Sequence, residues 1–229
     1  MFTSAIDTLT FLDVSSLSIA DLTGIENFTD LTYLNCWVNQ LTTLDVSQNT
    51  ALTVLNCYSN NLTTLDLSQN TALTYLWCTL NQLTSLDVSG ATALTDLDCS
   101  INQLTILDVS NNTALTTLWC DNNQLTTLDV RNGNNTNILD STFFCFNNPN
   151  LTCINVDDST WSAANWTVAN GSIDAQHYFS TNCGGTGIEE SSRNKKLLRT
   201  IDVLGRETKN QPLFYIYDDG TVKKRIVIE

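Results

Sequence analysis

The chain has 229 residues and a net charge of -14. That length suits one elongated domain with a small appendage, and no run of residues is long and apolar enough to span a bilayer. Of the ten basic residues only Arg131 precedes position 190, so the acidic body should repel phosphate backbones, which disfavours nucleic acid as a partner.

Residues 1–30 are predicted to form an N-terminal coil that acts as a partial cap. Leu9, Leu12 and Val14 match the apolar slots of the later repeats at a spacing of 22 residues. The start, MFTSAIDTLT, lacks a basic stretch followed by a long apolar core, so no secretory signal is visible. Because an exposed first coil normally needs a cap, we expect that a signal and cap were trimmed, in preference to a reading frame that starts late.

Residues 31–135 contain a 21-residue unit written five times, first as LTYLNCWVNQLTTLDVSQNTA. A fixed period of this length predicts a solenoid whose coils share one core. Alternation around Leu34 and Cys36 predicts one short strand per coil, and alternation around Leu44 and Val46 predicts a second on the opposite side. We therefore predict a mainly β fold, a two-sided parallel solenoid with coils about 4.8 Å apart.

The spacing L-x-x-L-x-C-x-x-N-x-L resembles the leucine-rich repeat, with Cys in a slot that is usually Leu. Each unit carries the pattern twice, as LTYLNC and then LTTLDV, and this nested form resembles the short bacterial leucine-rich class called IRREKO. The resemblance implies that the Asn of each unit turns inward and satisfies backbone groups at the bend. The column concerned is Asn39, Asn60, Asn81, Asn102, Asn123 and Asn148.

Two further columns run along the repeats. Cysteines recur once per coil and are interpreted as small core hydrophobes, because a line of thiols does not surround a metal ion tetrahedrally. Outward aspartates recur on the second strand, and two explanations stay open: local hydrogen bonds to Ser, Thr and backbone N–H groups, or a bound cation such as calcium. The columns are Cys36, Cys57, Cys78, Cys99, Cys120 and Cys145, and Asp45, Asp66, Asp87, Asp108 and Asp129.

The outward slots of the first strand differ from coil to coil, and several carry aromatic residues. Such rings either shield neighbouring strands or form a binding surface, because Tyr and Trp anchor interfaces and stack on sugar rings. The candidate ligand-binding residues are Tyr33, Asn35, Trp37, Asn56, Tyr58, Tyr75, Trp77, Asp96, Asp98, Trp119 and Asp121.

Residues 136–183 are predicted to form a degenerate last coil and a C-terminal cap. Cys153 aligns with an outward slot and Cys183 lies outside the repeats, so we predict a disulfide between them, which implies an oxidising compartment. His177 has no Cys or carboxylate partner at catalytic spacing and is given no role. Residues 184–194, with GGTG and EESSRN, are interpreted as a linker.

Residues 195–229 show three strand-like alternations separated by turns, which predicts a small three-stranded β unit. This stretch resembles the C-terminal sorting signal of the type IX secretion system of Bacteroidetes, in its flavobacterial form. The resemblance implies export across the outer membrane by that machinery. It is carried by Asp202, Leu204, Gly205, Arg206 and Glu207, by Tyr215 to Gly220, and by Lys224 to Glu229.

Together these features favour a secreted or cell-surface adhesion or binding protein, a monomer that recognises a protein or carbohydrate through its aromatic strand face. An ice- or mineral-binding protein and a purely structural spacer are the alternatives. The first is weakened because Ser85 and Ile106 interrupt the outward threonine column. No nucleophile with a base and no metal-ligand cluster stands out, so we predict neither an enzyme nor a cofactor.

Overall fold

The computed structural model describes residues 8–183, 197–201, 214–217 and 222–224, with side chains described in the first range. The chain divides into two compact units, Met1–Gly184 and Gly185–Glu229. Among the described residues no helix has the length and apolar character needed to cross a membrane. The repeat pattern predicts a parallel solenoid, and the first unit is one, with about 8 turns.

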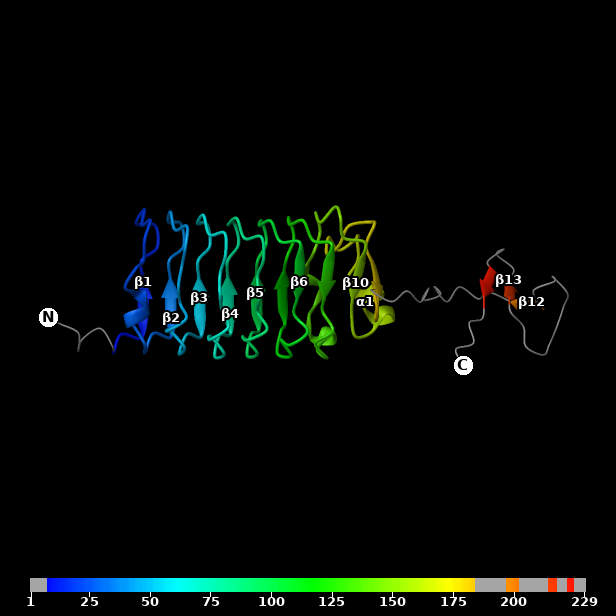
Figure 1. Cartoon of the computed structure of the whole chain (residues 1–229), viewed down its shortest axis with the longest axis horizontal. Coiled ribbons are helices and arrows are strands. Elements are labelled where there is room, and N and C mark those ends of the chain that lie inside the picture. Colours follow the sequence, from blue (N-terminus) through cyan, green and yellow to red (C-terminus); the bar gives the residue numbers. More distant parts are fainter. Residues whose placement is uncertain (1–7, 184–196, 202–213, 218–221, 225–229) are drawn as a thin grey trace. The chain divides into compact units, whose positions relative to one another are not determined.

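One side of the solenoid is a seven-stranded parallel sheet to which seven successive coils contribute one strand each (Figure 1). The strands pair in the repeat register, so that Leu34, Leu55 and Leu76 stand opposite one another. The sheet begins before the first full repeat, because Leu12 pairs with Leu34. In order along the sheet the strands are β1 (Phe11–Asp13), β2 (Tyr33–Asn35), β3 (Val54–Asn56), β4 (Tyr75–Trp77), β5 (Asp96–Asp98), β7 (Thr117–Trp119) and β9 (Phe143–Phe144).

The opposite side carries strands only toward the C-terminal end of the solenoid. In order they are β6 (Ile106–Asp108), β8 (Thr127–Asp129), β10 (Cys153–Asn155) and β11 (Tyr178–Ser180). The prediction of a second strand in every coil is therefore wrong for the first three repeats, where a single bridge joins Asp66 to Asp87. The sequence LTTLDV occurs at both 41–46 and 125–130, and only the second copy forms a strand. The second copy, as β8, pairs with β6 on one side and β10 on the other.

The core lies between the two sides and consists of the leucine and cysteine columns. Leu34, Cys36, Leu55, Cys57 and their counterparts in later coils are fully buried, which confirms the inward assignment. Burial raises the pKa of the Cys36 thiol to about 12 and also raises the pKa values of Cys57, Cys78 and Cys99. These thiols are therefore protonated at neutral pH and act as apolar packing groups.

The bend after each first strand is held by the asparagine column. The Asn81 side chain accepts a hydrogen bond from the Leu62 N–H at 3.0 Å and donates to the carbonyl oxygens of Cys57 and Cys78 at 3.0 and 3.1 Å. The same contacts recur at Asn60 and Asn102, so the implied role is confirmed. These bonds satisfy backbone groups that would otherwise be buried without partners.

The C-terminal cap closes the core with aromatic residues. Trp166 is fully buried, stacks on Phe143 with ring centroids 4.0 Å apart, and donates its indole N–H to the Ile138 carbonyl. Helix α1 (Ser159–Asn165) precedes it, with Asp158 as N-cap. A disulfide joins Cys153, the first residue of β10, to Cys183 at the end of the cap. Short 3-10 helices cover Ile25–Asn27, Asn135–Asn137 and Asp140–Thr142.

The second unit contains an antiparallel three-stranded sheet, which confirms the predicted β unit. Its strands are β12 (Leu197–Ile201), β13 (Phe214–Tyr217) and β14 (Val222–Lys224). Tyr215 lies in β13 and Lys224 ends β14. The remaining sorting-signal candidates, Asp202, Gly205, Arg206 and Gly220, lie outside the described residues.

Candidate functional site

The outward side chains of the seven-stranded sheet form the most distinctive surface of the solenoid, which we call the aromatic face. Several of its rings pack against one another along and across the strands. The centroid distances are 4.5 Å for Phe11–Tyr33, 6.2 Å for Trp37–Tyr58, 5.9 Å for Tyr75–Trp77 and 5.8 Å for Trp119–Phe144. The structure thus gathers the predicted aromatic residues on one surface.

The rings of the aromatic face shield one another only in part. Trp37, Tyr75 and Trp119 remain 36%, 39% and 37% exposed. Large rings left partly in water on a regular sheet are typical of surfaces that a partner covers. The shielding interpretation therefore accounts for the ring contacts but leaves a substantial apolar area without cover.

Three aspartates interrupt the aromatic face at its centre. Trp77, Asp98 and Trp119 stand opposite one another on β4, β5 and β7, so the carboxylate lies between two indole-bearing positions. Asp96 lies two residues earlier on β5, and Asp121 follows β7. The centre of the face is thus both acidic and aromatic.

The Asp98 carboxylate is held by a small network of hydroxyl groups. Its Oδ1 accepts hydrogen bonds from the Ser100 N–H at 3.0 Å and the Ser100 hydroxyl at 2.5 Å, and the Ser100 and Thr79 hydroxyl oxygens are 2.6 Å apart. Burial raises the pKa of Asp98 above its ordinary value, against the opposing effect of the Ser100 hydrogen bonds. Burial also raises the pKa of Asp121, and the charge of Asp98 adds to this shift.

Two of the candidate binding residues are less accessible than predicted. Asn35 and Asp98 point outward from the core but are only 7% and 9% exposed. Asn35 is covered because its amide donates to the Asp13 carboxylate on the neighbouring strand at 3.1 Å, and Asp98 because its hydroxyl partners and flanking strands surround it. Asn56, Tyr33, Tyr58, Trp77, Asp96 and Asp121 are partly exposed.

A ridge that sequence reasoning missed borders the aromatic face. Val38, Leu80 and Ile101 each precede an asparagine of the bend and adopt left-handed backbone conformations, with φ of 51°, 55° and 50°. All three are exposed. Bulky residues with positive φ are strained, and such strain concentrates at ligand-binding surfaces. The sequence did contain a signal for this ridge: these three coils carry an apolar residue at the position where other coils carry Ser59 or Asn122.

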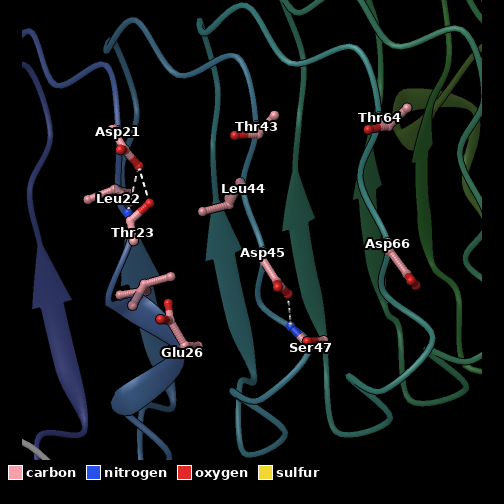
Figure 2. A pocket seen from close by; sticks show the side chains of 11 residues that line it. Asp21, Leu22, Thr23, Glu26, Thr43, Leu44, Asp45, Ser47, Thr64 and Asp66 are labelled. Atoms are coloured by element: carbon pink, nitrogen blue, oxygen red, sulfur yellow. Dashed lines mark hydrogen bonds between the residues drawn. The ribbon is translucent and has the colours of Figure 1, made fainter.

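The opposite side of the first coils carries an acidic cleft of about 500 Å³, lined by Asp21, Asp45, Asp66 and Glu26 (Figure 2). Asp21 and Asp45 accept hydrogen bonds from backbone N–H groups two residues further along the chain. Asp45 accepts from the Ser47 N–H at 3.0 Å, and Asp21 accepts from the Thr23 hydroxyl at 2.6 Å and the Thr23 N–H at 2.8 Å. These hydrogen bonds lower the pKa of both carboxyl groups. The structure thus favours the local-hydrogen-bond explanation of the aspartate column. In residues 8–183 no group of three or more metal-ligating side chains gathers.

His177 lies in the cap, against the end of the solenoid. Its imidazole is buried, and its Nε2 lies 3.4 Å from the Asn148 carbonyl oxygen and 3.7 Å from an Asp174 carboxylate oxygen. Burial lowers the pKa of the ring, which is therefore neutral at physiological pH. These contacts give His177 a packing role at the end of the asparagine column.

Comparison with known proteins places the solenoid among leucine-rich-repeat structures. No family model matches the chain. Internalin J of Listeria monocytogenes serotype 4b is 63% identical over 43 residues, which cover 19% of this chain and 5% of that protein. The solved functional domain of InlJ from Listeria monocytogenes, which includes a cysteine ladder, is 47% identical over 66% of this chain and 30% of that chain, with a TM-score of 0.54.

Two more distant structures share the fold alone. The internalin InlF of Listeria monocytogenes is 22% identical over 80% of this chain and 50% of its own, with a TM-score of 0.52. The ectodomain of the Arabidopsis thaliana receptor kinase GASSHO1/SCHENGEN3, in complex with CASPARIAN STRIP INTEGRITY FACTOR 2, is 22% identical over 65% of this chain and 18% of its own, with a TM-score of 0.50. The repeats, the stacked parallel strands and the buried cysteine column, together with these likenesses, make the body of this chain a leucine-rich-repeat solenoid similar to those of the internalins.

Proposed function

We propose that this protein is a secreted or cell-surface binding protein that recognises a protein ligand through its aromatic face. The observation that carries the proposal is the set of partly exposed rings, Trp37, Tyr75 and Trp119 above all, on the regular seven-stranded sheet. Leucine-rich-repeat proteins of internalin and receptor-ectodomain type commonly bind proteins. The strained apolar ridge beside the face adds further exposed area that a ligand would cover.

The triple variant Trp37→Ala, Trp77→Ala, Trp119→Ala is expected to lose binding to the protein ligand by at least tenfold, on the order of what removing interface anchors costs. The measurement is biolayer interferometry of the full chain against a panel of purified secreted and cell-surface ectodomains, beside a glycan array. Such rings also stack on sugars, so the array separates the two ligand classes.

The matched control carries Ile106→Ala and Tyr178→Ala, which remove exposed apolar side chains from the opposite sheet. Protein binding that the control keeps and the triple variant loses would support the proposal. Equal binding by parent and triple variant would overturn the assignment of the face. Binding to glycans alone would keep the face as the site and replace the protein ligand with a carbohydrate.

We also propose that residues 195–229 direct the protein through type IX secretion. The resemblance around Asp202, Gly205 and Arg206 supports this, and so does the small antiparallel sheet that contains Tyr215. The full chain, expressed behind a signal peptide in a flavobacterium, is expected to reach the cell surface or medium. A version ending at Cys183 is expected to stay in the periplasm. Immunoblotting of the fractions checks this, and equal export of both forms would contradict it.

A further inference from the structure

The centre of the aromatic face differs from the Trp37 and Trp119 positions in charge. At the N-terminal end Trp37 stacks on Tyr58, and at the C-terminal end Trp119 contacts Phe144. Between them, Asp98 occupies the slot that holds tryptophan in the coils on either side. The aromatic series is therefore replaced by a carboxylate at one position, with an indole on each flank.

Strand spacing sets the width of this position. Neighbouring strands lie about 4.8 Å apart, so the Cα atoms of Trp77 and Trp119, which are two strands apart, are separated by about 9 to 10 Å. That separation admits one ligand side chain above Asp98 with an indole on either flank. Trp119 is 37% exposed and Trp77 is partly exposed, so each ring keeps apolar area for such a group beyond its contact with Phe144 or Tyr75.

The electrostatic state of this position points to a cation. Asp98 is 9% exposed, and the nearby Asp121 is also partly buried, so both carboxylates have lost part of their hydration. Residues 1–183 contain seventeen acidic residues and one Arg or Lys, Arg131. The Arg131 guanidinium pairs with Asp129 on the opposite sheet. The solenoid thus supplies no basic side chain to the acidic centre of its own aromatic face.

We propose that Trp77, Asp98 and Trp119 form a clamp for a guanidinium group, that is, for an arginine side chain of the protein ligand. A guanidinium is planar and weakly hydrated, stacks on aromatic faces, and presents a donor fork that matches a carboxylate. Asp98 supplies the acceptor, Ser100 and Thr79 fix its orientation, and the two indoles supply the flanking rings. This inference rests on the proposed function, because it assigns the ligand chemistry of the same face.

The test uses the isotope-labelled full chain and follows the tryptophan indole N–H signals by NMR. The probes are N-acetyl-arginine amide and N-acetyl-citrulline amide, which have side chains of similar shape and differ in charge. The arginine probe is expected to shift the Trp77 and Trp119 signals to saturation while leaving the buried Trp166 signal in place. The citrulline probe is expected to leave all of them in place.

Two substitutions in one coil give the matched comparison. Asp98→Asn removes the central charge and keeps an acceptor for Ser100, and it is expected to weaken arginine binding by at least about tenfold, as for a lost hydrogen bond to a charged group. Asp108→Asn removes an exposed charge from the opposite sheet and is expected to change binding less than twofold. Thermal unfolding verifies that both variants are folded.

Equal shifts with arginine and citrulline would overturn the clamp without any variant being needed. Unchanged arginine binding by a folded Asp98→Asn variant would also overturn it. The two proposals can fail separately. If ectodomain binding depends on the three tryptophans but the arginine probe shifts neither the Trp77 nor the Trp119 signal, the binding face is supported and the clamp is contradicted.

Discussion

Replacing Asn81 with alanine is expected to lower the free energy of unfolding by about 3 to 5 kcal/mol. The side chain serves one buried N–H, that of Leu62, and two buried carbonyls, those of Cys57 and Cys78. Each buried group left without a partner costs about 1 to 3 kcal/mol. Alanine cannot reach any of them, and at the bend the core gives water little access to replace the lost bonds.

Urea unfolding followed by circular dichroism measures this loss, with Asn61→Ala as the control. Asn61 is exposed, and its carboxamide oxygen accepts a hydrogen bond from the Gln82 side chain at the surface. Its replacement is therefore expected to cost under about 0.5 kcal/mol. A loss for Asn81→Ala as small as that expected for the control would show that the inward asparagine is dispensable.

Leu76→Ala is expected to cost about 2 to 5 kcal/mol, the range for truncating a fully buried leucine. Leu76 is 0% exposed and lies between Leu55 and Leu97 of the adjacent strands. Because each coil packs only on its neighbours, the cavity cannot be refilled from elsewhere in the solenoid. The same urea experiment measures the effect.

Leu80→Ala is the matched control in the same coil. Leu80 is 39% exposed at the bend, and its loss is expected to cost under about 1 kcal/mol. A loss well under 1 kcal/mol for Leu76→Ala would contradict the inward assignment of that slot.

The repeat pattern predicted the core and the bends because these depend on local periodicity. Leu34 and Cys36 point inward because alternate residues of a strand lie on the same side of the sheet. Asn39 turns inward because the bend leaves buried backbone N–H and C=O groups that need hydrogen-bond partners. Cys153 was identifiable because it occupies an outward slot. In each case the residue and its neighbours in the repeat are enough to predict whether its side chain points into or out of the core.

Features that depend on contacts between coils were not predictable in this way. The copy of LTTLDV at residues 125–130 contains strand β8, which pairs with β6 and β10, and the identical copy at 41–46 contains none, so the six residues alone do not determine the outcome. Asp98 lies in an outward slot and is nevertheless buried, because its hydroxyl partners come from both its own coil and the adjacent one. The central part of the candidate site is therefore a property of stacked coils.

The asparagine column also gives the solenoid a direction. Each asparagine serves carbonyls of its own coil and of the coil before it, as Asn60 does for Cys57 and Cys36. The first coil carries Leu17 at the equivalent place, and the Leu17 N–H donates a hydrogen bond to the Asn39 carboxamide oxygen. An inserted 21-residue unit would bring its own asparagine and leave both ends unchanged. Duplication or loss of whole units thus offers evolution a way to lengthen or shorten the ligand-facing sheet in steps of about 4.8 Å without redesigning either terminus.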